Sequence, residues 1–208
     1  VKCGNFGLMS NFSFYYAHHI SSIEGGMICT NDYEIYDMAR LFRSHGMLRE
    51  ADSAEFKTRV ANEHQDLHEQ FIFYYPGYNM RNTEVGALIG LNQLKRIDEN
   101  VEKRQDNFLY FLSKIDSDKY RTDFYTHGGS NYSFQLILKD GDEAKRTRIQ
   151  EVMDASGIEW RRGAACGGNH LRQPYLQRTL GEFDLSKYPE ADYVHFNGCL
   201  LYTSDAAD

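Results

Sequence analysis

A short segment near the start of the chain, residues 11–26 with the sequence NFSFYYAHHISSIEGG, most constrains what this protein can be. Its aromatic-rich part predicts a strand at residues 12–16, and MICT predicts a second strand at residues 27–30. The turn between the two strands carries His18, and the pair Gly25–Gly26 lets backbone pack closely behind it. The segment therefore predicts a strand–turn–strand unit that presents an imidazole.

The spacing in this segment resembles the cofactor motif of the DegT/StrS-type sugar aminotransferases, which depend on pyridoxal phosphate (PLP). There an aromatic–Ser–aromatic triplet precedes a lysine and then Glu-Gly-Gly. Ser13 occupies the serine position, which implies that it binds the cofactor phosphate, and His18 occupies the lysine position. Imidazole has no primary amine to tether PLP, but it can carry a proton near neutral pH. No lysine lies between Lys2 and Lys57 to replace that amine. In this family the exchange marks the nucleotide-4-keto-6-deoxysugar 3-dehydratases, so the resemblance implies that His18 is catalytic; a lone histidine is otherwise usually structural.

A second motif, PGYNMRNTEVGALIGLNQLKR at residues 76–96, resembles the family signature GYNxR…A…G…QL. The resemblance implies that Asn79 reaches across a homodimer interface to the cofactor phosphate of the other subunit, so that two chains share each active site. It also places Arg81 in the same loop, as a weaker candidate for binding substrate. Without the resemblance, the segment reads as a turn followed by an amphipathic helix.

Three further residues are weaker candidates for binding the substrate. His45, in RSHGM, stands at the distance from His18 at which the 3-dehydratase branch has a second histidine. A histidine at a helix C-terminus that interacts with the helix dipole is an equally good interpretation. The stretch RRGAACGGNHLRQPY resembles the part that approaches the nucleotide-sugar, which implies hydrogen bonds from Asn169 and a charge partner for a diphosphate from Arg172. The alternative is a solvated glycine-rich loop.

The sequence gives no support for a metal centre. His64 and His68 have helical i,i+4 spacing, but neither an HExxH pattern nor a third ligand accompanies them. Of the two dehydratase types that share the histidine, the CDP-sugar type carries a [2Fe–2S] cluster, which needs four cysteine ligands or their equivalent. The cysteines are too dispersed for that: Cys3, Cys29, Cys166 and Cys199. The identity of the nucleotide, GDP or CDP, stays open because LRQPY resembles the CDP type.

Periodicity predicts the remaining elements. Asn31 or Asp32 is a predicted N-cap for a helix to about His45, and residues 48–70 predict a long loop with some helix. Apolar positions predict one long helix, with room for a kink, from Asn82 or Thr83 to about Ile115. A strand–helix–strand series follows, with a strand at 132–138, a helix between Asp142 and Gly157, and a strand at 158–162. This order predicts a small α/β lobe.

The resemblance implies an α/β fold, the C-terminal part of the aspartate-aminotransferase-like (fold type I) PLP-dependent transferases. Residues 1–50 are expected to end the large PLP-binding domain, 51–81 to form an excursion with an interface segment, and 82–198 to form the long helix and the small domain. Residues 199–208 resemble a translated sequencing adapter and are expected to lie outside the natural fold. An N-terminal part that supplies the acidic partner of the pyridine nitrogen is expected to be missing, which would leave these 208 residues alone inactive.

Charge and composition exclude other classes of protein. A net charge of −7 argues against nucleic-acid binding, and no apolar run has the roughly 20 residues of a membrane span. A cytoplasmic protein is expected. The resemblance implies a lyase of deoxysugar biosynthesis for O-antigen or lipopolysaccharide: a PLP/pyridoxamine phosphate (PMP)-dependent 3-dehydratase that takes its amino group from glutamate and acts on a GDP- or CDP-linked 4-keto-6-deoxyhexose. The alternatives are an ordinary sugar aminotransferase and a non-catalytic homologue that binds a sugar nucleotide.

Overall fold

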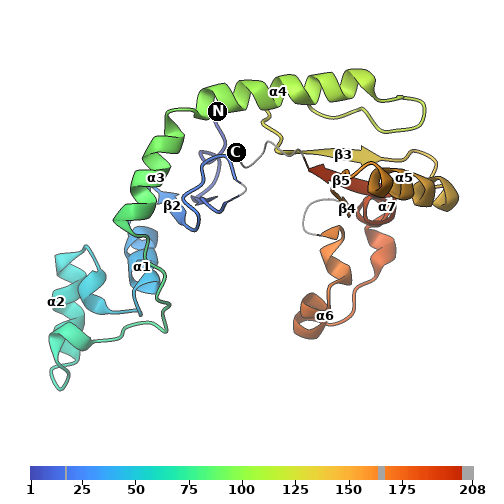
Figure 1. Ribbon diagram of the computed structural model, residues 1–208. Helices are drawn as coiled ribbons and strands as arrows, with labels where there is room; N and C mark the ends of the chain where they lie inside the picture. The colour runs from blue at the N-terminus through green and yellow to red at the C-terminus, as the bar shows by residue number, and fades with distance from the viewer. Residues whose placement is uncertain (17, 164–166, 203–208) are drawn as a thin grey trace. The chain divides into compact units, whose positions relative to one another are not determined.

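The computed structural model describes residues 1–16, 18–163 and 167–202 of the chain. Its internal contacts divide the chain into two units, unit 1 over residues 1–95 and unit 2 over residues 96–208. Figure 1 labels most of the helices and strands of both units. Each unit has its own sheet and its own buried residues.

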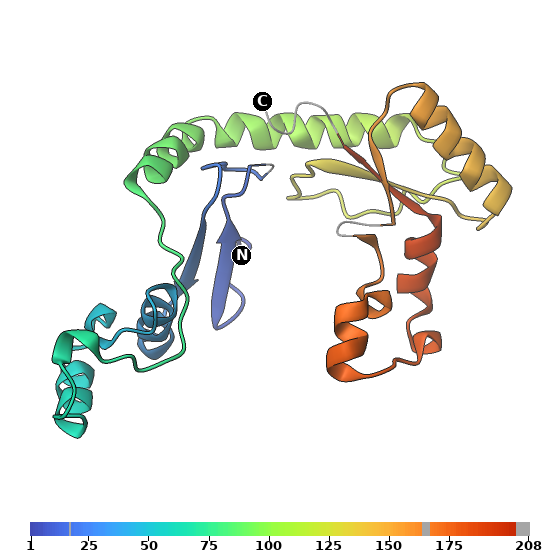
Figure 2. The same cartoon turned by 60° about the horizontal axis from the view of Figure 1, so that its bottom comes forward.

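Unit 1 begins with the predicted strand–turn–strand unit. Strand β1 (Met9–Ser13) pairs antiparallel with β2 (Gly26–Thr30), and Ser13 lies opposite Gly26. The pairing continues into the turn, where the Tyr16 amide donates to the Ile23 carbonyl over 3.0 Å. Figure 2 shows the two strands side by side. The strand–turn–strand prediction is confirmed, although β1 begins three residues earlier than the sequence indicates.

Helix α1 (Tyr33–Arg43) begins where its capping residue predicts. The Asp32 carboxylate accepts hydrogen bonds from the second and third amides of the helix at 2.9 and 3.0 Å, which satisfies groups that a helix N-terminus leaves unpaired. The helix ends two residues before the predicted His45. His45 and Gly46 follow with φ +61° and +72°, and the Gly46 amide donates to the Leu41 carbonyl over 2.8 Å, so two left-handed residues end the helix.

A small cluster of apolar side chains orders the segment that the sequence predicts as a long loop. The segment contains helix α2 (Ala54–Glu63) between the short 3₁₀ turns η1 (Leu48–Glu50) and η2 (Glu69–Phe71). Leu48, Val60 and Ile72 are at most 3% exposed and pack together, with Phe56 and Ala61 against them. Burying each of the three stabilises the unit by about 1.5–3 kcal/mol. The predicted helical part is confirmed, and its core holds the excursion in place.

The helix predicted from Asn82 or Thr83 to about Ile115, with room for a kink, is interrupted in the structure, which has two helices over this span. Helix α3 (Glu84–Leu94) begins at Thr83, whose hydroxyl accepts from the Gly86 amide over 3.2 Å, and it ends unit 1. Helix α4 (Ile97–Lys114) begins unit 2 after Arg96, which leaves helical geometry at φ −110° and ψ 0°. Acidic residues in the first turn of α4 favour a new N-terminus there. Apolar residues recur every three or four positions on both sides of Arg96, so the sequence pattern alone conceals the break.

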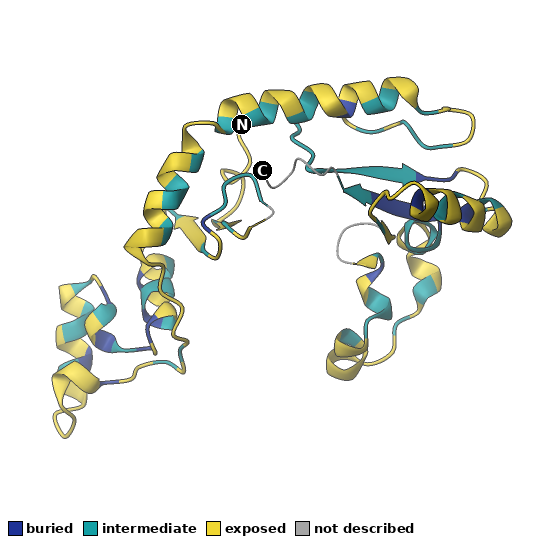
Figure 3. Ribbon diagram, in the orientation of Figure 1, coloured by how far each residue is buried: buried dark blue, intermediate teal, exposed yellow. Residues whose placement is uncertain are grey.

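Unit 1 exposes much of its apolar surface. Figure 3 shows α3 and the β1–β2 pair mostly in the colour of exposed residues. Val85 and Leu88 of α3 are both 68% exposed, and Phe12 and Ile28 of the strand pair are 39% and 50% exposed. A face this apolar is characteristic of a surface that another part of a protein covers.

Unit 2 is built on a three-stranded sheet. Strands β3 (Ser133–Ile137) and β4 (Trp160–Arg162) both pair antiparallel with β5 (Gly198–Tyr202), which lies between them. Helix α5 (Glu143–Ala155) connects β3 to β4, which confirms the predicted strand–helix–strand series. The central strand was not predicted from the sequence, because residues 199–208 resemble an adapter and were expected to lie outside the natural fold. Four of them, Cys199–Tyr202, lie in β5, and Leu200 is 1% exposed. Their origin in an adapter stays a prediction.

Further helices of unit 2 lie between β4 and β5 in the chain. They are α6 (Pro174–Leu180) and α7 (Pro189–Asn197), with the 3₁₀ turns η4 (His170–Arg172) and η5 (Leu185–Lys187). Phe111 of α4 stacks on Phe134 of β3 with ring centroids 4.5 Å apart, a contact that contributes about 0.5–1.5 kcal/mol beyond area burial.

Among the described residues, no helix combines the length and the apolarity needed to cross a membrane.

Candidate active site

His18 lies in the turn of the β1–β2 unit, two residues beyond the last ladder hydrogen bond on its side. Its amide donates to the Tyr15 carbonyl over 3.0 Å, and its ring meets the Tyr15 ring edge-on with centroids 5.9 Å apart. The residue is half-buried. The turn also holds Ile23 at φ +73°, a conformation that β-branched residues rarely adopt. The imidazole is thus carried by a constrained turn and stays accessible.

Ser13 is the last residue of β1 and is exposed. Its hydroxyl oxygen accepts a hydrogen bond from the Tyr15 amide over 3.3 Å, which leaves the hydroxyl hydrogen to be donated elsewhere. Its strand partner Gly26 accepts, through its carbonyl, a hydrogen bond of 2.9 Å from the Asn82 side chain. The serine therefore sits on a strand end that the start of α3 braces.

Two chain segments about 30 residues apart cross and bring His45 and Asn79 together. The His45 amide donates to the Tyr78 carbonyl over 2.6 Å, and Ser44 forms an antiparallel bridge with Asn79. His45 has φ +61°, which histidine adopts more readily than most residues. The residues His45 and Asn79 are both exposed, so the crossing offers their side chains at the surface of unit 1.

Arg81 stabilises the contact between these two crossing segments. Its Nε donates to the Ser44 hydroxyl oxygen over 2.9 Å, and its Nη2 lies 3.1 Å from the Glu50 carboxylate. Ser44 is fully buried, so the hydrogen bond from Arg81 reaches into the interior of the unit. The sequence placed Arg81 near a substrate; the structure pairs its charge with a carboxylate of its own unit. Glu50 and Asn82 are partners that sequence reasoning missed, since each acts over 30 or more residues.

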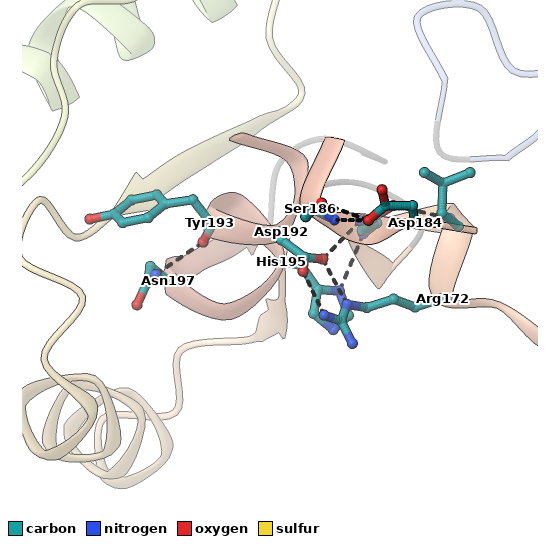
Figure 4. A network of polar contacts seen from close by, with 9 residues as sticks. Arg172, Asp184, Ser186, Asp192, Tyr193, His195 and Asn197 are labelled. Atoms are coloured by element: carbon teal, nitrogen blue, oxygen red, sulfur yellow. Dashed lines mark hydrogen bonds and ion pairs between the residues drawn. The ribbon is translucent and has the colours of Figure 1, made fainter. Parts of the chain in front are cut away.

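Asn169 and Arg172 lie in unit 2, and both bond to Asp192 of α7. Figure 4 shows the contact of Arg172 with Asp192. The Asn169 amide side chain donates to Asp192 over 2.8 Å, and Arg172 donates to both oxygens of the same carboxylate at 2.7 and 2.5 Å. The two hydrogen bonds from Arg172, together with that from Asn169, lower the pKa of Asp192 to about 2. The sequence did not single out Asp192 or its neighbour His195, although they stand three residues apart in a predictable helix register.

The predicted site residues therefore fall into two groups. Unit 1 carries Ser13, His18, His45, Asn79 and Arg81, and unit 2 carries Asn169 and Arg172. The histidines of the rejected metal motif do not share a helix: His64 caps the end of α2, and His68 accepts from the Gln70 amide at the start of η2. Within the described ranges, no group of three or more His, Cys, Asp or Glu residues is arranged to hold a metal ion.

Comparison with known proteins assigns the fold. The sequence profile of the DegT/DnrJ/EryC1/StrS aminotransferase family matches residues 1–193. The chain belongs to this family. The family resemblance stated on the two motifs is thereby confirmed, and so is the α/β fold of the PLP-dependent sugar aminotransferases.

Two curated relatives share one name with each other. GDP-4-keto-6-deoxy-D-mannose 3-dehydratase of Escherichia coli O55:H7 (strain CB9615 / EPEC) is 34% identical over 96% of this chain and 51% of its own length. The protein of that name from Yersinia pseudotuberculosis is 31% identical over 96% of this chain and 50% of its own length. The chain thus spans about half the length of these relatives.

Solved structures agree with this assignment. The E. coli GDP-4-keto-6-deoxy-D-mannose-3-dehydratase with bound hydrated PLP superposes with a TM-score of 0.79 at 31% identity, over 97% of this chain and 51% of that one. PseC of Helicobacter pylori, an aminotransferase of pseudoaminic acid biosynthesis, superposes with a TM-score of 0.70 at 22% identity, over 97% of this chain and 49% of that one, and shows the shared fold.

Proposed function

We propose that the protein containing this chain is a PLP/PMP-dependent 3-dehydratase of a nucleotide-linked 4-keto-6-deoxyhexose. The observation that carries this proposal is the histidine at position 18, in the turn where the family's aminotransferases have the cofactor lysine. Relatives at 31–34% identity that are named as 3-dehydratases support it. Their name favours a GDP-linked substrate over a CDP-linked one.

The donor set of unit 1 fits a cofactor that is held without a covalent bond. The Ser13 hydroxyl keeps a hydrogen to donate to a phosphate, and no amine stands between Lys2 and Lys57. Bound there, PMP would supply an amine for the C4 ketone of the sugar and a ring that stores electrons. Ser13 would hold the phosphate. His18 would stand over the reacting carbon.

His18 is the proposed proton carrier of this site. With the cofactor bound, its imidazole would take a proton from the cofactor's C4′ carbon and would give a proton to the C3 hydroxyl as that group leaves the sugar, since one positioned group can serve as base and then as acid. The overall change removes the C3 oxygen. Glutamate supplies the two electrons and leaves as 2-oxoglutarate and ammonia, which balances the reaction. The exchange of lysine for histidine favours elimination because no tethering amine competes for the cofactor.

The other candidate residues are proposed to bind the two ends of this assembly. Asn79 would reach the cofactor phosphate of a second subunit, with Arg81 holding its loop and His45 beside it. Exposed apolar residues of α3, which begins five residues after Asn79, support an interface there. In unit 2, the stretch with Asn169 and Arg172 would receive the nucleotide diphosphate. A cytoplasmic homodimer with shared sites is the proposed assembly.

The first experiment tests the reaction. Full-length protein is incubated with PLP, glutamate and either GDP-4-keto-6-deoxymannose or CDP-4-keto-6-deoxyglucose, and the products are analysed by mass spectrometry. Glutamate-dependent loss of the C3 oxygen is the expected result. An amino sugar as product would make the protein an aminotransferase, and binding without turnover would make it a non-catalytic homologue. Either result would overturn the proposal.

A second experiment tests the shared site. The variants His18→Asn and Asn79→Ala are each expected to be inactive, and mixing them is expected to restore activity. A mixed dimer then has one site with both native residues, so random exchange of subunits returns about a quarter of wild-type activity. No recovery after verified subunit exchange would show that His18 and Asn79 serve the same subunit's site.

A further inference from the structure

The carboxylate of Asp192 is the centre of a polar cluster that joins α7 to the residues after the glycine-rich loop. The cluster consists of Asn169, Arg172, Asp192 and His195, and we call it the α7 clamp. Asp192 Oδ1 accepts from both Asn169 Nδ2 and Arg172 Nε, and Oδ2 accepts from Arg172 Nη2. Figure 4 shows Arg172 lying against Asp192 and His195. One carboxylate thus satisfies three donors that lie about 20 residues earlier in the chain.

Asn169 is fixed from several sides. It is 5% exposed, its backbone amide donates to His195 Nδ1 over 3.2 Å, and its side-chain oxygen accepts from the Leu171 amide over 3.0 Å. A buried amide with this many partners is costly to rearrange, since each broken hydrogen bond leaves a desolvated polar group. Asn169 therefore locks the backbone at the start of η4 instead of presenting a free donor.

Glycines allow the close approach of this stretch to α7. A Cβ on Gly168, which has φ +86°, would lie 2.5 Å from His195 Nδ1, and a Cβ on Gly163 would lie 2.9 Å from the Gly168 Cα. The Gly163 amide in turn donates to the Gly198 carbonyl, at the start of the central strand, over 2.7 Å. The stretch is thus pressed onto α7 and β5, and its conformation depends on the clamp.

Arg172 is not a free cation in this arrangement. Its guanidinium lies 4.8 Å from the Phe196 ring centroid and forms a bidentate salt bridge with Asp192. Its positive charge therefore already has a partner. A diphosphate that recruited Arg172 would have to compete with that carboxylate. The structure therefore favours a role for Arg172 in holding the loop over a role as the direct charge partner.

We propose that Asp192 is a positioning residue, which through Asn169 and Arg172 holds residues 167–172 in the conformation that receives the diphosphate of the nucleotide-sugar. This inference rests on the proposed function, because it concerns the nucleotide-sugar that the proposed reaction uses. The clamp organises the loop before substrate arrives and so lowers the conformational cost of binding. Asp192 itself touches neither substrate nor cofactor.

Asp192→Asn tests the proposal, because the two possible roles of Arg172 predict opposite changes in the affinity for the nucleotide-sugar. If Arg172 bound the diphosphate directly, loss of the competing charge would free it and tighten binding. The clamp predicts instead that the dissociation constant of full-length protein for GDP-mannose, measured by calorimetry, and the KM for the keto-sugar rise about 10- to 100-fold. The expected kcat stays within about twofold, since the chemistry takes place at His18.

A matched control and a second readout separate positioning from general damage. Asp184→Asn removes a nearby carboxylate whose side-chain contacts are Ser186 and Lys187, and it is expected to behave as wild type. Hydrogen exchange of the peptide over residues 167–173 is expected to speed up in Asp192→Asn alone. Arg172→Lys, which keeps the charge but not the bidentate salt bridge, is expected to weaken binding as Asp192→Asn does.

The outcomes are distinct. Unchanged or tighter binding by Asp192→Asn, or wild-type binding by Arg172→Lys, would overturn the clamp while leaving the proposed function intact. Failure of the wild-type protein to bind or turn over either GDP- or CDP-sugar would remove the proposed function, and with it the substrate role of the clamp.

Discussion

Gly46 and Gly77 lie with their backbones in direct contact, and neither position has room for a side chain. A Cβ on Gly77 would overlap the Gly46 amide nitrogen, and a Cβ on Gly46 would overlap the Tyr75 carbonyl. This contact lets the segment that carries His45 cross the segment that carries Asn79. The pair of glycines therefore determines whether these two proposed site residues meet.

Gly46→Ala is expected to destabilise the protein by about 2 kcal/mol or more, because it adds a steric overlap to a left-handed backbone. Gly128→Ala is the matched control. Gly128 has the same φ of +72° but nothing within 4 Å of a Cβ, so only the backbone cost of about 1 kcal/mol is expected there. Chemical denaturation of the full-length protein measures the loss of stability in both variants. Equal losses at the two positions would contradict the close contact.

Ile23 is expected to be a stabilisable position. It has φ +73° and is 65% exposed, so its side chain contributes few contacts that offset the strain. Ile23→Asn is expected to raise the free energy of unfolding by about 1 kcal/mol, since asparagine tolerates the left-handed region. The same change at Ile28, inside β2, is expected to lower it. If thermal unfolding shows Ile23→Asn to be the less stable protein, the turn around His18 is not strained as described.

The Arg172–Asp192 pair is expected to weaken in acid. The pKa of Asp192 is held at about 2 in the folded state, below its usual 3.8, by hydrogen bonds from Arg172 and Asn169. A depressed pKa stabilises the fold above the unfolded value, and that contribution is lost as pH falls through the folded value. The stability difference between wild type and Asp192→Asn is thus expected to be constant from pH 7 to about 5, and to disappear as pH falls from about 4 to 2.

Denaturation series at several pH values check this expectation, with Asp184→Asn as the control. A difference between wild type and Asp192→Asn that persists unchanged at pH 2 would mean that the native carboxylate is not charged through its contact with Arg172.

Local signals in the sequence were sufficient for the elements that depend on them. Asp32 and Asp142 mark the starts of α1 and α5, because a capping side chain acts within three residues. The break at Arg96 was not visible, since apolar residues recur every three or four positions on both sides of it. The central strand β5 was missed because its residues were excluded from the fold as adapter-like.

In the candidate site, too, local patterns identify single residues but not their distant partners. The two motifs identify Ser13, His18 and Asn79 by resemblance, and the family is confirmed. The sequence could not show that Arg81 bonds Ser44, or that Arg172 pairs with Asp192, because 37 and 20 residues separate the partners. Such contacts depend on how the chain crosses itself, which no local pattern reports.

Exchanging His18 for lysine, the residue that it replaces in the turn, tests whether the imidazole acts at the reacting carbon. Full-length wild type, His18→Lys and the neighbouring control His19→Lys are each loaded with PLP, reduced with borohydride and analysed by peptide mass spectrometry, and their glutamate-dependent loss of the sugar C3 oxygen is measured. We expect a covalent pyridoxyl group at position 18 only in His18→Lys, together with a fall in C3 deoxygenation of about 10²–10⁴-fold. Full deoxygenation by His18→Lys with no cofactor attached at position 18 would contradict the claim that His18 stands at the reacting carbon.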